Sequence, residues 1–171
     1  MTRVSFPRLT YLEIDVTYET VLALPDSFLG GSAPRLQKLY FYGIPIPALP
    51  KLLLTTTNLA KLTLWRTPHS GYVSPGVMVA CLASLIRLKF LTLGFHSPRS
   101  RPNRTSRRLP PLTRTVLPVL DYFEFRGTSE YLEELVAQID TPCINEVHIS
   151  FFNQLIFDVP LLPVPQSYRA F

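Results

Sequence analysis

The sequence predicts an α/β fold in which short parallel strands stack side by side, while helices or irregular turns lead from each strand to the next. Three observations predict it. A six-position frame of the type apolar-x-x-apolar-x-apolar occurs six times, and the frames follow one another at similar intervals. Four of the six frames also have a proline two residues before their first apolar position, which is typical of the entry to a strand.

The frames show both the repeat and its inward face. Every apolar position of every frame holds an apolar residue, although only 47% of the chain is hydrophobic. The frames are Leu9/Leu12/Ile14, Leu36/Leu39/Phe41, Leu59/Leu62/Leu64, Leu88/Leu91/Leu93, Leu120/Phe123/Phe125 and Ile144/Val147/Ile149. The last four positions of each frame alternate, so one set of side chains points inward and the other outward. We expect the six central frame residues to stack inside: Leu12, Leu39, Leu62, Leu91, Phe123 and Val147.

The spacing gives the fold class a name. Successive frames begin 27, 23, 29, 32 and 24 residues apart, close to the ~20–29 residues of leucine-rich repeats. The sequence therefore predicts a leucine-rich-repeat solenoid, with a parallel sheet on its concave face and helices or irregular turns on its convex face. About six irregular repeats would form one domain over residues 1–160, followed by a Pro-rich tail over residues 161–171.

The segments between the frames predict the helices that lead from one strand to the next. Ser74 is placed to cap a helix that has Pro75 at its first position and continues to residue 86. Ser129 is placed to cap a second helix over residues 130–139, which has an apolar stripe and acidic residues in its first turn. Residues 49–56 predict a shorter helix, and residues 26–29 a single turn.

The net charge of +5 belongs to one segment. Residues 97–115 contain no acidic residue, and without their six arginines the chain has 11 basic against 12 acidic residues. We expect this basic insert to be disordered and solvated. The alternative is an electrostatic patch for nucleic acid or an acidic partner, although no aromatic residue within it could stack on a base. The arginines concerned are Arg99, Arg101, Arg104, Arg107 and Arg108, with Arg114 near its end.

Several other classes of function are not expected. The sequence has no apolar run long enough for a membrane span and no signal-peptide pattern, which predicts a cytoplasmic or nuclear protein. Cys81 and Cys143 lack metal-ligand spacing, so we expect no metal or other cofactor. Catalytic motifs are also absent from the sequence, and His69-Ser70 is interpreted as part of a turn and not as a base with its nucleophile. The chain is therefore not expected to be an enzyme.

The outward strand positions predict a binding surface instead. Aromatic residues are dense there, and Tyr, Trp and Arg are the residues that most often dominate protein interfaces. The alternative is that these rings only stabilise the sheet through cross-strand packing. We predict a protein-binding patch with its centre at Tyr40, Tyr42, Trp65 and Phe90, extended by Tyr122 and Arg126.

Several segments resemble the irregular leucine-rich-repeat regions of fungal F-box proteins, namely Leu24-Pro-Asp-Ser-Phe-Leu-Gly-Gly-Ser-Ala-Pro-Arg-Leu36, Pro68-His-Ser-Gly-Tyr-Val-Ser-Pro75, Gly94-Phe-His-Ser-Pro-Arg-Ser-Arg-Pro102, Ser129-Glu-Tyr-Leu-Glu-Glu-Leu135 and Gln154-Leu-Ile-Phe-Asp158. The resemblance implies that the concave face recognises a target protein for a ubiquitin ligase. The first frame begins at Leu9 and leaves no room for an F-box, so a Skp-type adaptor is expected only if an F-box lies upstream. The alternative interpretation is a truncated fragment with no independent function, because Pro160, Pro163 and Pro165 interrupt the pattern.

Overall fold

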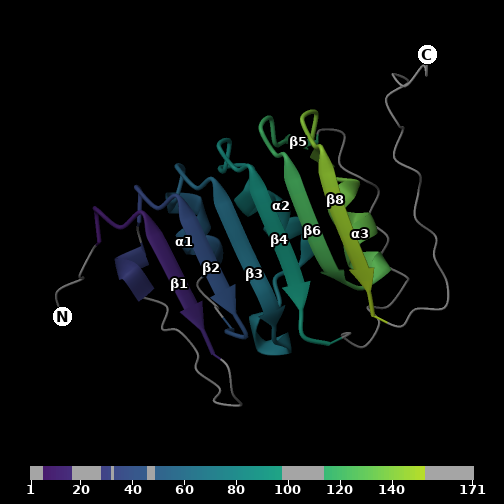
Figure 1. The fold of residues 1–171 in the computed structure, drawn as a ribbon, viewed down its shortest axis with the longest axis horizontal. Helices are drawn as coiled ribbons and strands as arrows, with labels where there is room; N and C mark the ends of the chain where they lie inside the picture. Colours follow the sequence, from purple (N-terminus) through teal and green to yellow (C-terminus); the bar gives the residue numbers. More distant parts are fainter. Residues whose placement is uncertain (1–5, 17–27, 32, 46–48, 98–113, 153–171) are drawn as a thin grey trace.

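The computed structural model describes residues 6–16, 28–31, 33–45, 49–97 and 114–152 (Figure 1). It is a mixed α/β structure built on a six-stranded parallel sheet whose strand order follows the sequence, β1-β2-β3-β4-β6-β8. The strands are β1 (Tyr11–Asp15), β2 (Lys38–Tyr42), β3 (Lys61–Thr67), β4 (Phe90–Phe95), β6 (Tyr122–Gly127) and β8 (Glu146–Phe151). The predicted α/β class and parallel sheet are confirmed, and every strand of this sheet overlaps one frame.

Helices lie behind one face of this sheet in Figure 1, and they differ from the prediction at their ends. They are α1 (Leu49–Thr55), α2 (Pro75–Leu82) and α3 (Ser129–Val136), with 3-10 turns η1 (Phe28–Gly31) and η2 (His69–Gly71). Ser74 is the N-cap of α2 as expected, but its side chain makes no capping bond. The cap of α3 is Thr128 and not Ser129, because the Thr128 hydroxyl accepts the N–H of Tyr131.

The same backbone turn precedes every strand of the main sheet. In each repeat the N–H of the first frame residue donates to the carbonyl three residues earlier, at 3.0 to 3.3 Å. The donors are Leu9, Leu36, Leu59, Leu88, Leu120 and Ile144. The backbone therefore repeats with the same period as the apolar frame.

A second backbone motif joins each repeat to the next. The carbonyl just after the first frame residue accepts two N–H groups from the start of the following strand, at 2.8 to 3.1 Å. The acceptors are Thr10, Gln37, Ala60, Lys89 and Asp121. These shared carbonyls fix the register, which pairs Leu39 with Leu62 and Leu91 with Phe123.

The core lies between the sheet and the helices, and its burial is uneven along the strand order. Leu39, Leu62, Leu91 and Phe123 are buried, and Leu12 is half-buried against the same core. The prediction for Val147 was wrong, because its side chain is 45% exposed. Helix α3 packs behind β6, and among the described elements no further helix follows to cover β8.

A second, two-stranded sheet was not predicted. It pairs β5 (Thr115–Val116) in parallel with β7 (Ile139–Asp140). Thr115 N–H donates to the carbonyl of Gln138 at 2.9 Å, and Leu117 N–H to that of Asp140 at 2.8 Å. Thr115, expected at the end of the basic insert, is thus held in a strand. Ile139, expected in a helix, is its partner.

Three parts of the domain prediction lie outside the described residues. They are most of the basic insert, the end of the repeat domain beyond Phe152 and the Pro-rich tail over residues 161–171. Within the described part, no helix is both long and apolar enough to cross a membrane.

Candidate protein-interaction surface

The face of the sheet turned away from the helices is here called the outer face. Because side chains alternate along a strand, the frame residues fill the helix side and the residues between them fill the outer face. This face carries the six predicted binding residues Tyr40, Tyr42, Trp65, Phe90, Tyr122 and Arg126, together with Tyr11, Glu13, Asp15, Lys38, Lys61, Thr63, Thr92, Gly94, Glu124, Glu146, His148 and Ser150.

A line of aromatic rings and one ammonium group crosses the outer face. It is called the ring ladder and consists of Tyr11, Tyr40, Lys61, Phe90, Tyr122 and His148, one residue from each strand in turn. The strands of a sheet lie ~4.8 Å apart, so rings on neighbouring strands can touch without distorting the backbone. The ladder spans all six strands of the main sheet.

Lys61 stands at the middle of the ladder. Its Nζ lies 5.4 Å from the ring centroid of Tyr40 and 5.5 Å from that of Phe90, so one ammonium bridges two rings. Such cation–π contacts contribute ~0.5–1 kcal/mol each at exposed sites. The bridge joins the aromatic residues of β2 and β4 across β3.

Ring-to-ring contacts extend the ladder to both sides. The centroids of Tyr11 and Tyr40 are 5.5 Å apart, those of Phe90 and Tyr122 are 6.2 Å apart, and those of Tyr122 and His148 are 5.6 Å apart. All three pairs are tilted, a favourable arrangement for aromatic pairs. The ladder is therefore continuous and contains three of the predicted binding residues, Tyr40, Phe90 and Tyr122.

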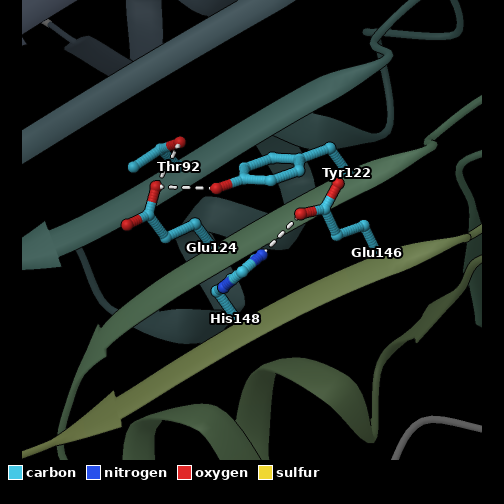
Figure 2. Close-up of polar contacts among 5 residues, drawn as sticks. All are labelled: Thr92, Tyr122, Glu124, Glu146 and His148. Carbon is cyan, nitrogen blue, oxygen red and sulfur yellow. Dashed lines mark hydrogen bonds and ion pairs between the residues drawn. The ribbon is translucent and has the colours of Figure 1, made fainter.

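Carboxylates on the outer face hold ladder residues in place (Figure 2). Glu124 accepts hydrogen bonds from the Tyr122 hydroxyl at 3.1 Å and the Thr92 hydroxyl at 3.4 Å. On β8, Glu146 contacts His148 Nε2 at 2.6 Å. Burial and the bond to Glu124 raise the pKa of Tyr122, because both favour the neutral phenol.

The same arrangement occurs at the other end of the ladder. The Tyr11 hydroxyl donates to Glu13 two residues along β1. This hydrogen bond, with smaller effects of burial and of the charge on Glu13, raises the pKa of Tyr11 to about 12. The Tyr11 hydroxyl therefore keeps its proton to a higher pH than that of an ordinary tyrosine.

Trp65 belongs to a separate contact beside the ladder. It pairs in register with Tyr42 on β2, and its ring packs against Gly94 on β4. Burial raises the pKa of Tyr42. The four residues predicted as one patch therefore fall into two groups, with Tyr40 and Phe90 in the ladder and Tyr42 and Trp65 beside it.

A β-bulge accompanies the Trp65 contact. Leu64 pairs with Leu93 and Thr67 pairs with Phe95, so Trp65 and Arg66 together stand opposite Gly94. Arg66 has a φ of 55°, in the left-handed region that side chains other than glycine rarely adopt. The extra residue turns Thr67 to the helix side of the sheet, the side of its partner Phe95.

The remaining predicted residues are placed as follows. Arg126 is exposed on β6, and its guanidinium lies 5.8 Å from the ring centroid of Phe152. The insert residues Arg99, Arg101, Arg104, Arg107 and Arg108 lie outside the described residues.

Comparison with protein-family models, with curated proteins and with solved structures gave no match. The resemblance to fungal F-box repeats therefore stays a prediction.

The ladder also contains Tyr11, Lys61 and His148, which were not among the predicted binding residues. The signal that could have found them is the register, since Lys61 lies between two strands that carry aromatic residues.

The described residues also bear on metal binding and on thiol chemistry. No group of three or more His, Cys, Asp or Glu side chains among them could hold a metal ion. Cys81 is buried, which raises the pKa of its thiol, while Cys143 is exposed.

Proposed function

We propose that this chain is an irregular leucine-rich-repeat solenoid and that its outer face, the concave face of the solenoid, binds a partner protein. The observation that carries the proposal is the ring ladder: five rings and one ammonium in continuous contact on the sheet face that the helices leave free. Large rings with polar edges bury much area at low entropic cost, which is why they dominate interfaces.

The backbone supports the repeat architecture. The turn before each strand and the shared carbonyl after it recur at the spacing of the apolar frame. Parallel strands that follow one another in space as in sequence are what a stack of repeats requires. The convex side would then be formed by α1, α2 and α3.

The charges of the outer face support a protein as the partner. Acidic side chains such as Glu13 and Glu124 are interspersed with basic ones such as Lys38 and Arg126. A nucleic acid would favour a face that is positively charged throughout, whereas a protein partner can match charges of both signs. With the resemblance to F-box repeats, we propose that the partner is a target for ubiquitin ligation, and any contact with a Skp-type adaptor would need an F-box outside this sequence.

Charge reversal at the centre of the ladder tests the proposal. Lys61→Glu removes the ammonium between two rings, whereas Lys51→Glu makes the same change on the exposed surface of α1. A partner captured from cell extract by the unaltered chain should be retained by Lys51→Glu and lost with Lys61→Glu, a loss on the order of 2 kcal/mol or more of binding free energy. Lys51→Glu should melt close to the parent, and Lys61→Glu should melt only a few degrees lower, because it loses two exposed cation–π contacts.

A second variant separates binding from folding. Phe90→Ala removes a ring that is 37% exposed, so it should weaken the same partner while changing stability little. Equal capture by the parent and by both ladder variants would contradict the proposal. Loss of capture in parallel with loss of thermal stability would show that the ladder is only cross-strand packing.

A further inference from the structure

A cavity of about 280 Å³ lies at the edge of the sheet where β3, β4 and β6 end. Residues at or just beyond the carboxyl ends of these strands contribute to its wall, among them Thr67, Phe95 and Thr128. Segments that follow three neighbouring strands therefore converge on one space. The cavity is distinct from the ring ladder and involves none of the ladder residues.

Aromatic rings form the apolar wall of the cavity. The centroid of Tyr131 lies 4.8 Å from that of Phe95 and 5.8 Å from that of Tyr72, and Phe152 contributes a fourth ring to the lining. Tyr131 is buried and its hydroxyl donates to the carbonyl of Val73 at 3.1 Å, which fixes the ring. The wall is therefore formed before any ligand binds.

Acidic side chains line the cavity from helix α3. Glu130 and Glu134 are four residues apart, so they project from one face of the helix toward the same space. His69 also lines the cavity, and its Nε2 lies 2.9 Å from Ser97 Oγ. No lysine or arginine is among the described residues that line the cavity.

We propose that this cavity binds a guanidinium group, carried either by an arginine side chain of a partner or by a free small molecule. A guanidinium is planar and weakly hydrated, so it can stack on the aromatic wall while its N–H groups donate to the carboxylate of Glu134, with Glu130 on the same face of the helix. A compact ammonium satisfies the carboxylates but does not stack in this way, so arginine is preferred over lysine.

Titration of the full chain with N-acetyl-arginine amide tests the proposal, with N-acetyl-citrulline amide as the uncharged analogue of the same shape. The arginine compound should bind in the millimolar range and shift the NMR signals of Tyr72 and Tyr131. The citrulline compound should bind at least ~10-fold more weakly, since it lacks the charge. Added salt should weaken arginine binding, because the carboxylates face solvent. No binding of the arginine compound, or equal binding of both, would overturn the proposal.

Carboxylate variants locate the site. Glu134→Gln should weaken arginine binding ~10-fold or more with an unchanged melting curve, because Glu134 is exposed. Glu133→Gln is the matched control, since Glu133 is adjacent on the same helix but does not line the cavity. Equal loss in both variants would mean that the general charge of α3 is responsible and would overturn the assignment. Methylguanidinium identifies the source: binding as tight as that of the arginine compound indicates a small molecule, and weaker binding indicates a side chain.

Discussion

The indole ring of Trp65 occupies the space that a side chain at Gly94 would need. A β-carbon built on Gly94 would lie 2.7 Å from Cζ3 and 2.9 Å from Cδ2 of Trp65, well inside van der Waals contact. Glycine is therefore required at this position by the tryptophan on the neighbouring strand and not by the backbone of β4. The contact links the bulge of β3 to the centre of the sheet.

Gly94→Ala should displace Trp65 and destabilise the fold by ~1–3 kcal/mol, the usual range for overpacking a filled site. Trp65 is the single tryptophan of the chain, so its fluorescence reports this site alone. We expect a shifted emission maximum and a lower melting temperature. Gly76→Ala is the control, because the nearest atom to a β-carbon there is 4.0 Å away. An unchanged spectrum for Gly94→Ala would contradict the contact.

Phe90 and Phe125 should respond very differently to truncation. Phe125 is fully buried in the core, so Phe125→Ala should cost ~3–5 kcal/mol of unfolding free energy. Phe90 belongs to the partly exposed ring ladder, and Phe90→Ala should cost only ~1 kcal/mol or less. Denaturant unfolding measures both. A cost for Phe90 that approached the cost for Phe125 would make the ladder a part of the core.

Stability should fall steeply in alkali because of Tyr131. Burial, with smaller effects of Tyr72 and Glu134, raises its pKa above the ordinary value of 10.0. The folded state therefore favours the neutral phenol, and this contribution is complete below pH 10. Above it the unfolded chain loses the proton first, so stability should fall by ~1.4 kcal/mol per pH unit up to the folded pKa.

Tyr131→Phe should remove this part of the alkaline slope. It should also cost ~1 kcal/mol at neutral pH, because the hydrogen bond to the carbonyl of Val73 is lost. Unfolding in denaturant at a series of alkaline pH values measures the difference between parent and variant. An identical slope in both would show that the phenol ionises without opening the fold.

Amide exchange should be fastest in the last described strand. On the helix side of β8, Val147 and Ile149 are 45% and 43% exposed, whereas the equivalent Leu62 and Leu91 of β3 and β4 are buried. Local opening costs least where few apolar contacts must break. Hydrogen exchange should therefore be slowest in β3 and β4 and faster in β8. Uniform protection across the sheet would show that β8 is covered in solution.

The sequence predicts the sheet well because the frame is a strong periodic signal. Leu62 and Leu91 occupy the expected inward positions, and β3 and β4 lie where the frames place them. The exposure of Val147 could not be predicted, since burial of an inward side chain depends on the layer that follows it. The two-residue strands β5 and β7 are too short to have a period. Ser129 and Thr128 are both good caps, so the sequence alone does not decide which begins α3.

The sequence predicts Tyr40, Tyr42, Trp65 and Phe90 as one patch, but it does not predict that they divide between the ring ladder and the Trp65 contact. Aromatic type alone selects Tyr40 and Trp65, whereas connection depends on register and on the bulge, which no glycine or proline marks in the sequence. The cavity is less predictable still. Residues as distant in the sequence as Tyr72 and Phe152 line it, and they come together only when the sheet is folded.

The agreement between strand order in the sheet and strand order in the sequence has a consequence for biosynthesis. Each strand of the main sheet pairs with the main-sheet strand made before it, so a new strand that leaves the ribosome finds its hydrogen-bonding partner already in place. Assembly can then keep pace with translation without holding a distant half of the chain open. A ribosome that stalls late would leave behind a folded amino-terminal part with one fresh sheet edge, which is a far smaller target for chaperones than an unfolded chain.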